Sequence, residues 1–398
     1  MVKEKVIGGF TLKKSFIVLL LGLYMFSSAG SALAEESTVD LADDATSAIL
    51  IERDTGQVLY EKNSGEKLPP ASMTKVMTML LIMEAIDSGK ITWDEKVRTS
   101  ERAASMGGSQ IFLEPGEEMT VEEMMKGIAI ASGNDASVAM AEHLAGSEEQ
   151  FVQMMNDKAK KLGLKNTHFV NSNGLPAENH YSSAEDLALM AKALLKYEEI
   201  TKYTSLYEDY LRQDTDDEFW LVNTNKLVKF YPGVDGLKTG FTNEAKYCLT
   251  ASANKNGMRI IAVVMGAPTP KDRNRQVTEM LDYAYSQYEL QRRYDRGQVL
   301  GEAEVSKGST KTVPALAKEN VSLLMKKGEN VEGITERLEI NEIPAPVKKG
   351  DTIGTLYVEK DGKILSETTV VAEEDVSEAS LWTLMKRTTS ALVGNEIN

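Results

Sequence analysis

The chain has 398 residues, of which 42% are hydrophobic, and a formal net charge of −15. This length suits one large core and a smaller second domain. So acidic a chain lacks the basic face that binds phosphate, which argues against a nucleic-acid partner. It contains three histidines and one cysteine, Cys248. It therefore forms no intramolecular disulfide and has no H-E-x-x-H zinc motif, and we expect no metal site and no cofactor.

The first 34 residues are typical of an export signal. Four lysines accompany the apolar run Phe16 to Phe26, which is too short to span a bilayer comfortably. Ala32-Leu33-Ala34 supplies the small residues that a signal peptidase requires. We therefore expect residues 1–34 to be a signal peptide and the exported, mature protein to begin at Glu35. An uncleaved anchor helix is the alternative interpretation.

Apolar patterns predict an α+β domain over residues 35–292, with helices packed on an antiparallel sheet. A hairpin, Ser47 to Glu61, turns at Arg53-Asp54-Thr55-Gly56. The expected helices are Ser72 to Ile86, Val121 to Leu144 and Ser183 to Leu195. The expected strands are Leu237 to Gly240, Tyr247 to Ala253 and Arg259 to Met265. Strands, a helical block and then antiparallel strands are typical of this fold class.

The sequence changes character near Gln291-Arg292-Arg293. Short β-type runs separated by turn residues predict a small all-β domain over residues 296–376. Residues 378–398 return to helical spacing and predict an amphipathic C-terminal helix.

One motif pairs a serine with a lysine. Ser72-Met73-Thr74-Lys75 matches S-x-x-K at the start of an apolar helix. Residues i and i+3 share one helix face, with Cβ atoms about 5–6 Å apart, so the amine could take the serine proton. The helix N-terminus would help to stabilise an oxyanion. Two further copies, Ser64 to Lys67 and Ser252 to Lys255, show that chance also produces this motif.

Two further motifs carry polar groups suited to a peptide substrate. Ser132-Gly133-Asn134 matches S-x-N in a small-residue segment, which could approach a ligand or simply form a tight helix junction. Lys238-Thr239-Gly240 occurs once. On an edge strand, Lys238 and Gly240 would share one face, and Gly240 would leave room for a peptide added as a strand. An ordinary strand entering a turn is the alternative.

In the order Ser72, Ser132, Lys238, these motifs resemble those of the penicillin-recognising serine enzymes. Within that group the chain is similar to the low-molecular-mass penicillin-binding proteins that act as D-alanyl-D-alanine carboxypeptidases, and most similar to the sporulation-associated type. The resemblance spans nearly the whole chain. It implies a β-lactamase-like catalytic domain, a small all-β domain and a C-terminal helix. It also implies removal of the terminal D-alanine from peptidoglycan stem pentapeptides, and acylation by β-lactam antibiotics.

The resemblance implies a role for each motif residue. Ser72 would be the acylated nucleophile, Lys75 its general base and Ser132 a proton relay. The substrate-binding residues would be Asn134, Lys238, Thr239, Gly240, Phe241 and Arg273. Among these, Asn134 would bind the substrate amide, and Lys238 and Thr239 the terminal carboxylate, with help from Arg273. The backbone N–H groups of Ser72 and Phe241 would form the oxyanion hole. Many relatives have histidine at the position of Phe241, but a backbone role tolerates that change.

The C-terminal segment bears on location. Leu381, Leu384, Met385, Thr388 and Leu392 follow helical spacing, and Lys386 and Arg387 are the only charges between Leu381 and Gly394. A cationic amphipathic helix suits the interface of an anionic membrane, so we expect peripheral attachment to the outer face of the cytoplasmic membrane. Packing of this helix on its own β domain is the alternative.

Three other functions compete with the carboxypeptidase hypothesis. An endopeptidase that cuts peptidoglycan cross-links could use the same site. A β-lactamase is less favoured, because the Glu-x-x-Leu-Asn signature of class A enzymes is missing from the sequence. A non-catalytic wall-binding protein is disfavoured because all three motifs are intact.

Overall fold

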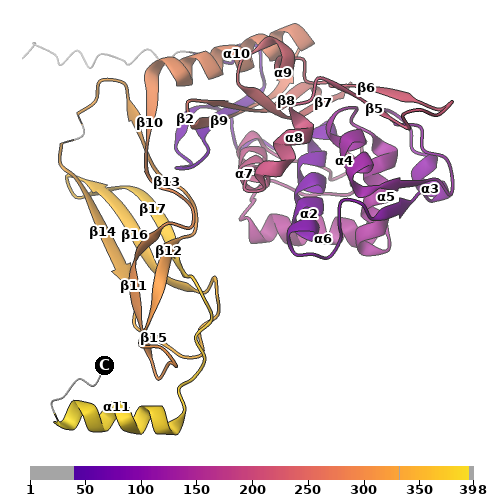
Figure 1. Cartoon of the computed structure of the whole chain (residues 1–398). Helices are drawn as coiled ribbons and strands as arrows, with labels where there is room; N and C mark the ends of the chain where they lie inside the picture. The colour runs from indigo at the N-terminus through magenta and orange to yellow at the C-terminus, as the bar shows by residue number, and fades with distance from the viewer. Residues whose placement is uncertain (1–39, 331, 394–398) are drawn as a thin grey trace, which may run out of the picture. The chain divides into compact units, whose positions relative to one another are not determined.

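The computed structural model describes residues 40–330 and 332–393. The signal peptide expected at residues 1–34 lies outside these residues, as do residues 394–398 of the expected C-terminal helix. The described chain has the predicted α+β class, with a helix-on-sheet domain followed by an all-β domain (Figure 1).

Five antiparallel strands form the sheet of the first domain, in the order β2-β1-β9-β8-β7. Their bounds are β1 Ser47–Glu52, β2 Val58–Lys62, β7 Val234–Thr242, β8 Lys246–Lys255 and β9 Met258–Ala267. Side chains of β1 alternate, with Ile49 and Ile51 in one core and Ala48 and Leu50 in the other. The sheet is thus buried on both faces, which explains its nearly continuous apolar strands. The motif Lys238-Thr239-Gly240 lies on β7, at the sheet edge, as predicted.

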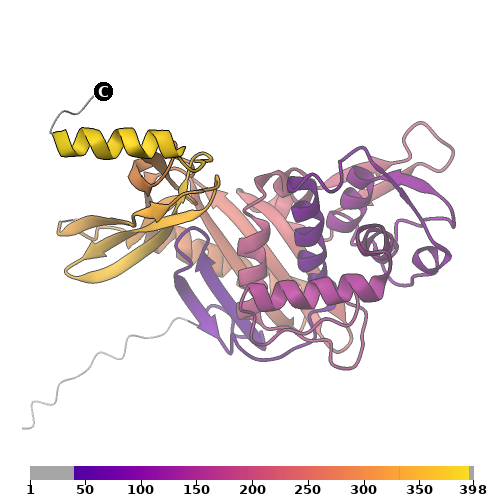
Figure 2. The same ribbon diagram turned by 90° about the horizontal axis from the view of Figure 1, so that it is seen from below.

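Helices cover both faces of this sheet. Helix α10 (Pro270–Gln287) packs on one face through Val277, Met280 and Leu281. The helical block on the other face lies over the strands in Figure 2. Its main helices are α2 Lys75–Asp87, α4 Val121–Ala129, α5 Asn134–Ala145, α6 Glu148–Lys161 and α7 Ala184–Leu194. Short elements complete the domain: β3 Lys96–Arg98, α3 Glu101–Ala104, β4 Glu118–Thr120, η2 Glu198–Ile200, α8 Thr201–Thr204, β5 Glu208–Leu211, β6 Phe219–Val222 and α9 Leu227–Phe230.

Two of the predicted helices need correction. The helix expected from Ser72 begins as a 3-10 turn, η1 (Ala71–Thr74), and becomes α-helical only at Lys75. The helix expected over Val121 to Leu144 is divided into α4 and α5. The division falls at Ser132, whose φ of +65° is incompatible with a right-handed helix. Helical periodicity continues across the break because both helices bury apolar side chains in the same core.

The second domain is all-β. Its main sheet has the order β14-β16-β17-β12-β11-β15, and β10 pairs with β13. The bounds are β10 Tyr288–Tyr294, β11 Val299–Ser306, β12 Thr312–Ala317, β13 Val321–Lys326, β14 Ile334–Ile340, β15 Ile343–Pro344, β16 Thr352–Lys360 and β17 Lys363–Ala372. Strand β10 extends across the boundary expected between residues 292 and 296. Its pairing with β13 begins at Tyr288, directly after α10.

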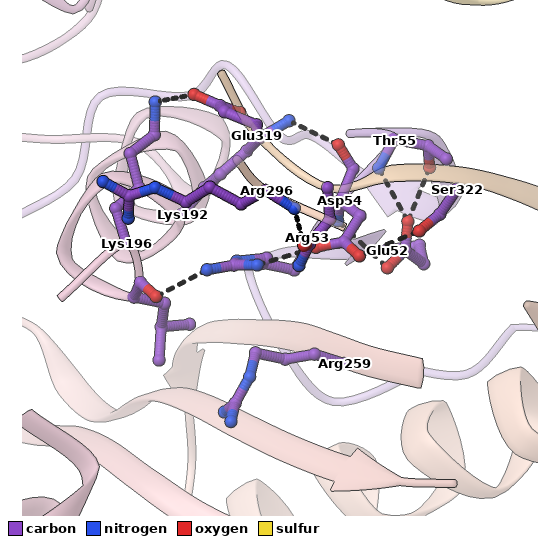
Figure 3. Close-up of polar contacts among 12 residues, drawn as sticks. Glu52, Arg53, Asp54, Thr55, Lys192, Lys196, Arg259, Arg296, Glu319 and Ser322 are labelled. Atoms are coloured by element: carbon purple, nitrogen blue, oxygen red, sulfur yellow. Dashed lines mark hydrogen bonds and ion pairs between the residues drawn. The ribbon is translucent and has the colours of Figure 1, made fainter. Parts of the chain in front are cut away.

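Polar contacts join the β1–β2 turn to this second domain (Figure 3). The Glu52 carboxylate accepts hydrogen bonds from the backbone N–H groups of Asp54 and Thr55, which fixes the turn. The Asp54 carboxylate then accepts from Arg292 of β10 and from the Ser322 hydroxyl of β13, each at 3.0 Å. One acidic side chain therefore ties the first hairpin to both strands.

Helix α11 (Leu381–Val393) follows the second domain. Arg387 donates hydrogen bonds to the backbone carbonyls of Gly308 and Ser309, at 2.8 and 2.9 Å. The apolar side chains of Leu381, Trp382 and Met385 remain 82%, 76% and 63% exposed. Among the described residues, no helix combines the length and apolar character needed to cross a membrane.

Candidate active site

Ser72 lies in the 3-10 turn η1, immediately before α2. In 3-10 geometry, side chains at i and i+3 lie one above the other, which aligns Ser72 with Lys75. The Lys75 Nζ atom is 3.1 Å from Ser72 Oγ. The shared face expected from S-x-x-K is therefore present, although the turn that produces it is tighter than an α-helix.

The Lys75 amine is buried and held by neutral acceptors. Its side chain has no exposed surface, and Nζ lies 2.6 Å from Asn134 Oδ1 and 2.7 Å from the Asn173 carbonyl oxygen. Burial holds the pKa of Lys75 well below its usual range, and the positive charge of Lys238 lowers this pKa further. Asp135 opposes the shift, but its carboxylate already accepts from the backbone N–H groups of Ile111 and Leu113. The site thus favours a neutral amine beside a serine hydroxyl.

Asn134 links Lys75 to a neighbouring loop. It is the first residue of α5, and its Nδ2 donates to the Gly107 carbonyl at 2.7 Å. Two residues earlier, the Ser132 hydroxyl is buried and has no hydrogen-bond partner among residues 40–330 and 332–393. A buried hydroxyl without a protein partner costs free energy unless a ligand or water engages it. Ser132 therefore has hydrogen-bonding capacity to spare inside the site.

Lys238 and Thr239 occupy the edge strand β7. Lys238 is almost fully buried, and burial together with the nearby Arg273 lowers the pKa of Lys238 to about 7. Its Nζ donates to the Thr239 carbonyl at 3.2 Å. The Thr239 hydroxyl lies 2.7 Å from that of Thr224. Lys238, Arg273 and two threonine hydroxyls therefore gather where a carboxylate would be attracted.

Arg273 and Phe241 differ in solvent exposure. Arg273, on α10, is 6% exposed, and burial lowers the pKa of its guanidinium. The Phe241 side chain is 49% exposed and stacks on Tyr247, with 4.4 Å between ring centroids. The Phe241 side chain thus packs on a strand neighbour, and the role expected of its backbone N–H stays a prediction.

Gly240 lies on the edge strand as predicted, but the reason we gave for a glycine there was wrong. We expected the missing side chain to leave room for substrate. A Cβ atom at residue 240 would instead lie 2.8 Å from the Pro70 carbonyl oxygen and 3.2 Å from Met73 Cγ. The protein's own Ser72 turn fills this space. Glycine is needed here so that the edge strand can approach the turn that carries Ser72.

Three contributors to the site were missed in the sequence. They are the Asn173 carbonyl, the Thr224 hydroxyl and the Asp135 carboxylate. Asn173 lies in Asn171-Ser172-Asn173-Gly174, a run rich in turn formers that could have been predicted as a loop. Nothing in local periodicity places that loop against Lys75. Among the described residues, no group of three His, Cys, Asp or Glu side chains could hold a metal ion.

Comparisons with known proteins agree with this geometry. Residues 34–269 match the model of the D-alanyl-D-alanine carboxypeptidase family, peptidase S11, and residues 288–378 match the C-terminal domain of penicillin-binding protein 5. The chain is 61% identical to D-alanyl-D-alanine carboxypeptidase DacF of Bacillus subtilis, over 95% of this chain and 98% of the relative. The crystal structure of penicillin-binding protein 5 from Haemophilus influenzae is 31% identical, with a TM-score of 0.67 over 84% of this chain and 98% of that one. Penicillin-binding protein D2 from Listeria monocytogenes, solved in an ampicillin-bound form, is 31% identical, with a TM-score of 0.55 over 61% of this chain and 98% of that one.

The glycine at residue 174 gives a direct test of how the site is packed. A Cβ atom there would lie 1.9 Å from the Ala71 carbonyl oxygen, whereas one at Gly163 would meet nothing within 4 Å. Both glycines have positive φ, +88° and +73°. Gly163→Ala should therefore cost only the backbone strain, about 1–2 kcal/mol of unfolding free energy. Gly174→Ala should cost at least about 2 kcal/mol more, the scale of overpacking. Urea denaturation measures both; equal losses would show that the loop does not press on the Ser72 turn.

Proposed function

This chain belongs to the D-alanyl-D-alanine carboxypeptidase family of serine peptidases, and we propose that Ser72 is the residue that the substrate acylates. The observation that carries the proposal is the buried Lys75 amine, 3.1 Å from Ser72 Oγ. Lys75 is the general base, because the environment lowers its pKa and so supplies the neutral form. A serine with an adjacent neutral amine is equipped for acyl transfer.

Acylation follows from these positions. As Ser72 Oγ attacks the carbonyl carbon of the penultimate D-alanine, its proton passes to Lys75 Nζ. The oxyanion receives hydrogen bonds from the backbone N–H groups of Ser72 and Phe241. When the C–N bond breaks, Lys75 returns this proton to the leaving D-alanine nitrogen through Ser132, whose hydroxyl has no other partner among the described residues. Water then attacks the ester as Lys75 takes a proton from the water. Lys75 passes this proton to Ser72 Oγ as the shortened peptide leaves, which restores the serine hydroxyl and the neutral amine.

Substrate binding uses the positive side of the site. We assign the terminal carboxylate of the stem peptide to Lys238 and Thr239, with Arg273 adding positive charge behind them. The Thr239 hydroxyl donates to that of Thr224 at 2.7 Å, so one hydroxyl hydrogen of this pair is left to donate to the carboxylate. Asn134 is assigned to the substrate amide. A β-lactam presents an amide and a carboxylate in similar relation, so it should enter the same site and acylate Ser72.

Replacing Lys75 by arginine tests the general base. Lys75→Arg keeps a long basic side chain, but arginine stays protonated at all accessible pH values and cannot accept the serine proton. The rate constant for acylation of Ser72 by benzylpenicillin should fall by about 100- to 10,000-fold, the usual contribution of a general base. Mass spectrometry of the Ser72 adduct measures this rate. Lys161→Arg, an exposed position on α6, is the matched control and should react normally. Near-normal acylation of Lys75→Arg would contradict the assignment.

The proposed roles of Lys75 and Lys238 predict opposite changes of kcat/KM with pH, a rise on the acid side and a fall on the alkaline side. Lys75 works only when neutral, so kcat/KM should rise with pH through the lowered pKa of this residue. Lys238 attracts the carboxylate only when protonated, and its pKa is about 7, so kcat/KM should fall above that pH. The measurement is the release of D-alanine from a soluble tripeptide across a pH range. Because arginine keeps its proton, Lys238→Arg should lose the descending limb while it retains the ascending one. A descending limb that survives this change would remove Lys238 from the carboxylate site.

We further propose that α11 attaches the exported enzyme to the outer face of the cytoplasmic membrane. Its support is the exposed apolar group Leu381, Trp382 and Met385, with Lys386 also exposed. Arg387 is bonded to Gly308 and Ser309, so it orients the helix instead of contributing a free cation. We also propose a role in sporulation, because the sequence motifs resemble those of the sporulation-associated type.

Cell fractionation tests the membrane proposal. Deleting residues 377–398, or changing Leu381, Trp382 and Met385 together to serine, should move the protein from the membrane to the soluble fraction. Neither change touches the catalytic site, so hydrolysis of a soluble tripeptide should persist. Arg387→Gln is the control: it removes the contacts with the β domain but keeps the apolar group, and should stay with the membrane. Unchanged membrane association of the serine variant would overturn the proposal.

A further inference from the structure

A buried carboxylate outside the recognised motifs connects to the general base. Glu148 is the first residue of α6 and is 4% exposed. Its Oε1 accepts from both the backbone N–H and the hydroxyl of Ser172, at 3.0 and 2.8 Å. Its Oε2 accepts from Arg102.

The segment that Glu148 holds delivers an acceptor to Lys75. Ser172 precedes Asn173, whose carbonyl oxygen is 2.7 Å from Lys75 Nζ. The Ser172 carbonyl accepts from the Thr78 hydroxyl at 2.6 Å, and Thr78 lies on α2 three residues after Lys75. Asn171 Oδ1 accepts from the backbone N–H of Gly174 at 2.7 Å. Three consecutive peptide groups of this loop are therefore each fixed by a separate hydrogen bond. Glu148 holds the first of them, through the Ser172 N–H.

The direction of the Lys75 lone pair depends on this carbonyl. A neutral amine has two N–H bonds and one lone pair. Asn134 Oδ1 and the Asn173 carbonyl take the two N–H bonds, so the lone pair is left for the Ser72 hydroxyl. If the Asn173 carbonyl moves, the amine can turn toward other acceptors and the lone pair no longer faces Ser72.

We propose that Glu148 is a positioning residue for the general base: through Ser172 it holds the Asn173 carbonyl that aims the amine of Lys75 at Ser72. The inference rests on the proposed roles of Ser72 and Lys75. What Glu148 must supply is a hydrogen-bond acceptor at the correct distance from α6. Its charge serves the ion pair with Arg102, whose side chain is 56% exposed and can turn to water.

A variant series separates the acceptor from the charge. Glu148→Ala removes the acceptor, and acylation of Ser72 by benzylpenicillin should slow by about 10- to 100-fold, the scale of a small misplacement of catalytic groups. Glu148→Gln keeps an oxygen at the same reach without the charge, and should stay within about threefold of the native rate, since the amide still accepts. Glu148→Asp keeps the charge but is one methylene shorter, and should be slowed nearly as much as the alanine variant. The glutamine and aspartate variants decide the question even if the alanine variant fails to fold.

The rate must be expressed per reactive serine, so that loss of folded protein is not counted as loss of catalysis. A hydrogen bond from Lys75 Nζ to the Asn173 carbonyl favours the charged ammonium, so displacement of this carbonyl should lower the pKa of Lys75. The ascending limb of the acylation rate should then move to lower pH in the alanine and aspartate variants, but not in the glutamine variant. The control is Glu84→Gln, which removes an ion pair between α2 and α6 that involves Lys158 and does not touch the loop; it should change neither rate nor limb.

The outcomes differ clearly. Slow acylation with a shifted limb in the alanine or aspartate variant, together with a nearly normal glutamine variant, supports the inference. A normal rate per serine without the Glu148 acceptor would overturn it. So would an equally impaired glutamine variant, which would assign the effect to charge, or a slowed rate with an unmoved limb. Because Lys75→Arg tests the base itself, failure of that experiment is distinguishable from failure of this one.

Discussion

The rest of this site depends on a lysine amine that is buried without an anionic partner. Lys75 has no exposed surface, and its hydrogen-bond partners are a hydroxyl, a side-chain amide and a backbone carbonyl, all neutral. Burying an ammonium ion without a directly bonded anion costs several kcal/mol, so the fold disfavours the charged form. Lys238 adds repulsion in the same direction. The protein thereby accepts a locally unfavourable charge arrangement, and in the mechanism we propose this arrangement supplies the neutral amine that acts as the base.

Enclosing that amine requires segments distant in the sequence. Helix α2 carries Lys75 itself, the start of α5 supplies Asn134, the loop before α7 supplies Asn173, and the edge strand β7 supplies Lys238. Glycine permits the close approach at two places. A side chain at Gly174 would collide with Ala71, and one at Gly240 would crowd Pro70. The sheet and the helical block must therefore both be in place before the amine is shielded from water. The site is a property of the whole domain.

Local patterns in the sequence predict individual strands and helices, but not which distant segments meet at the site. Strands buried on both faces appear as continuous apolar runs, so β8 and β9 were predictable, and an i, i+3 spacing survives the change from an α-helix to a 3-10 turn. The break at Ser132 was not predictable as a boundary, because α4 and α5 bury apolar residues in one core and their periodicity continues. Asn173, Thr224 and Glu148 were missed for another reason. Their contacts join residues 15 to 98 positions apart, and no local pattern encodes such a distance.

The two buried lysines of the site are chemically identical, and their surroundings give them different tasks in the mechanism we propose. Lys75 is enclosed by acceptors that orient it, whereas Lys238 has the Thr239 carbonyl as its acceptor and a pKa of about 7. A carboxylate that binds beside Lys238 stabilises the proton there, so charge and countercharge enter the site together. Because that pair is neutral overall, an anionic substrate adds little net charge near Lys75 and does not restore the proton to the base. The arrangement thus lets one amine attract an anion while its neighbour stays neutral.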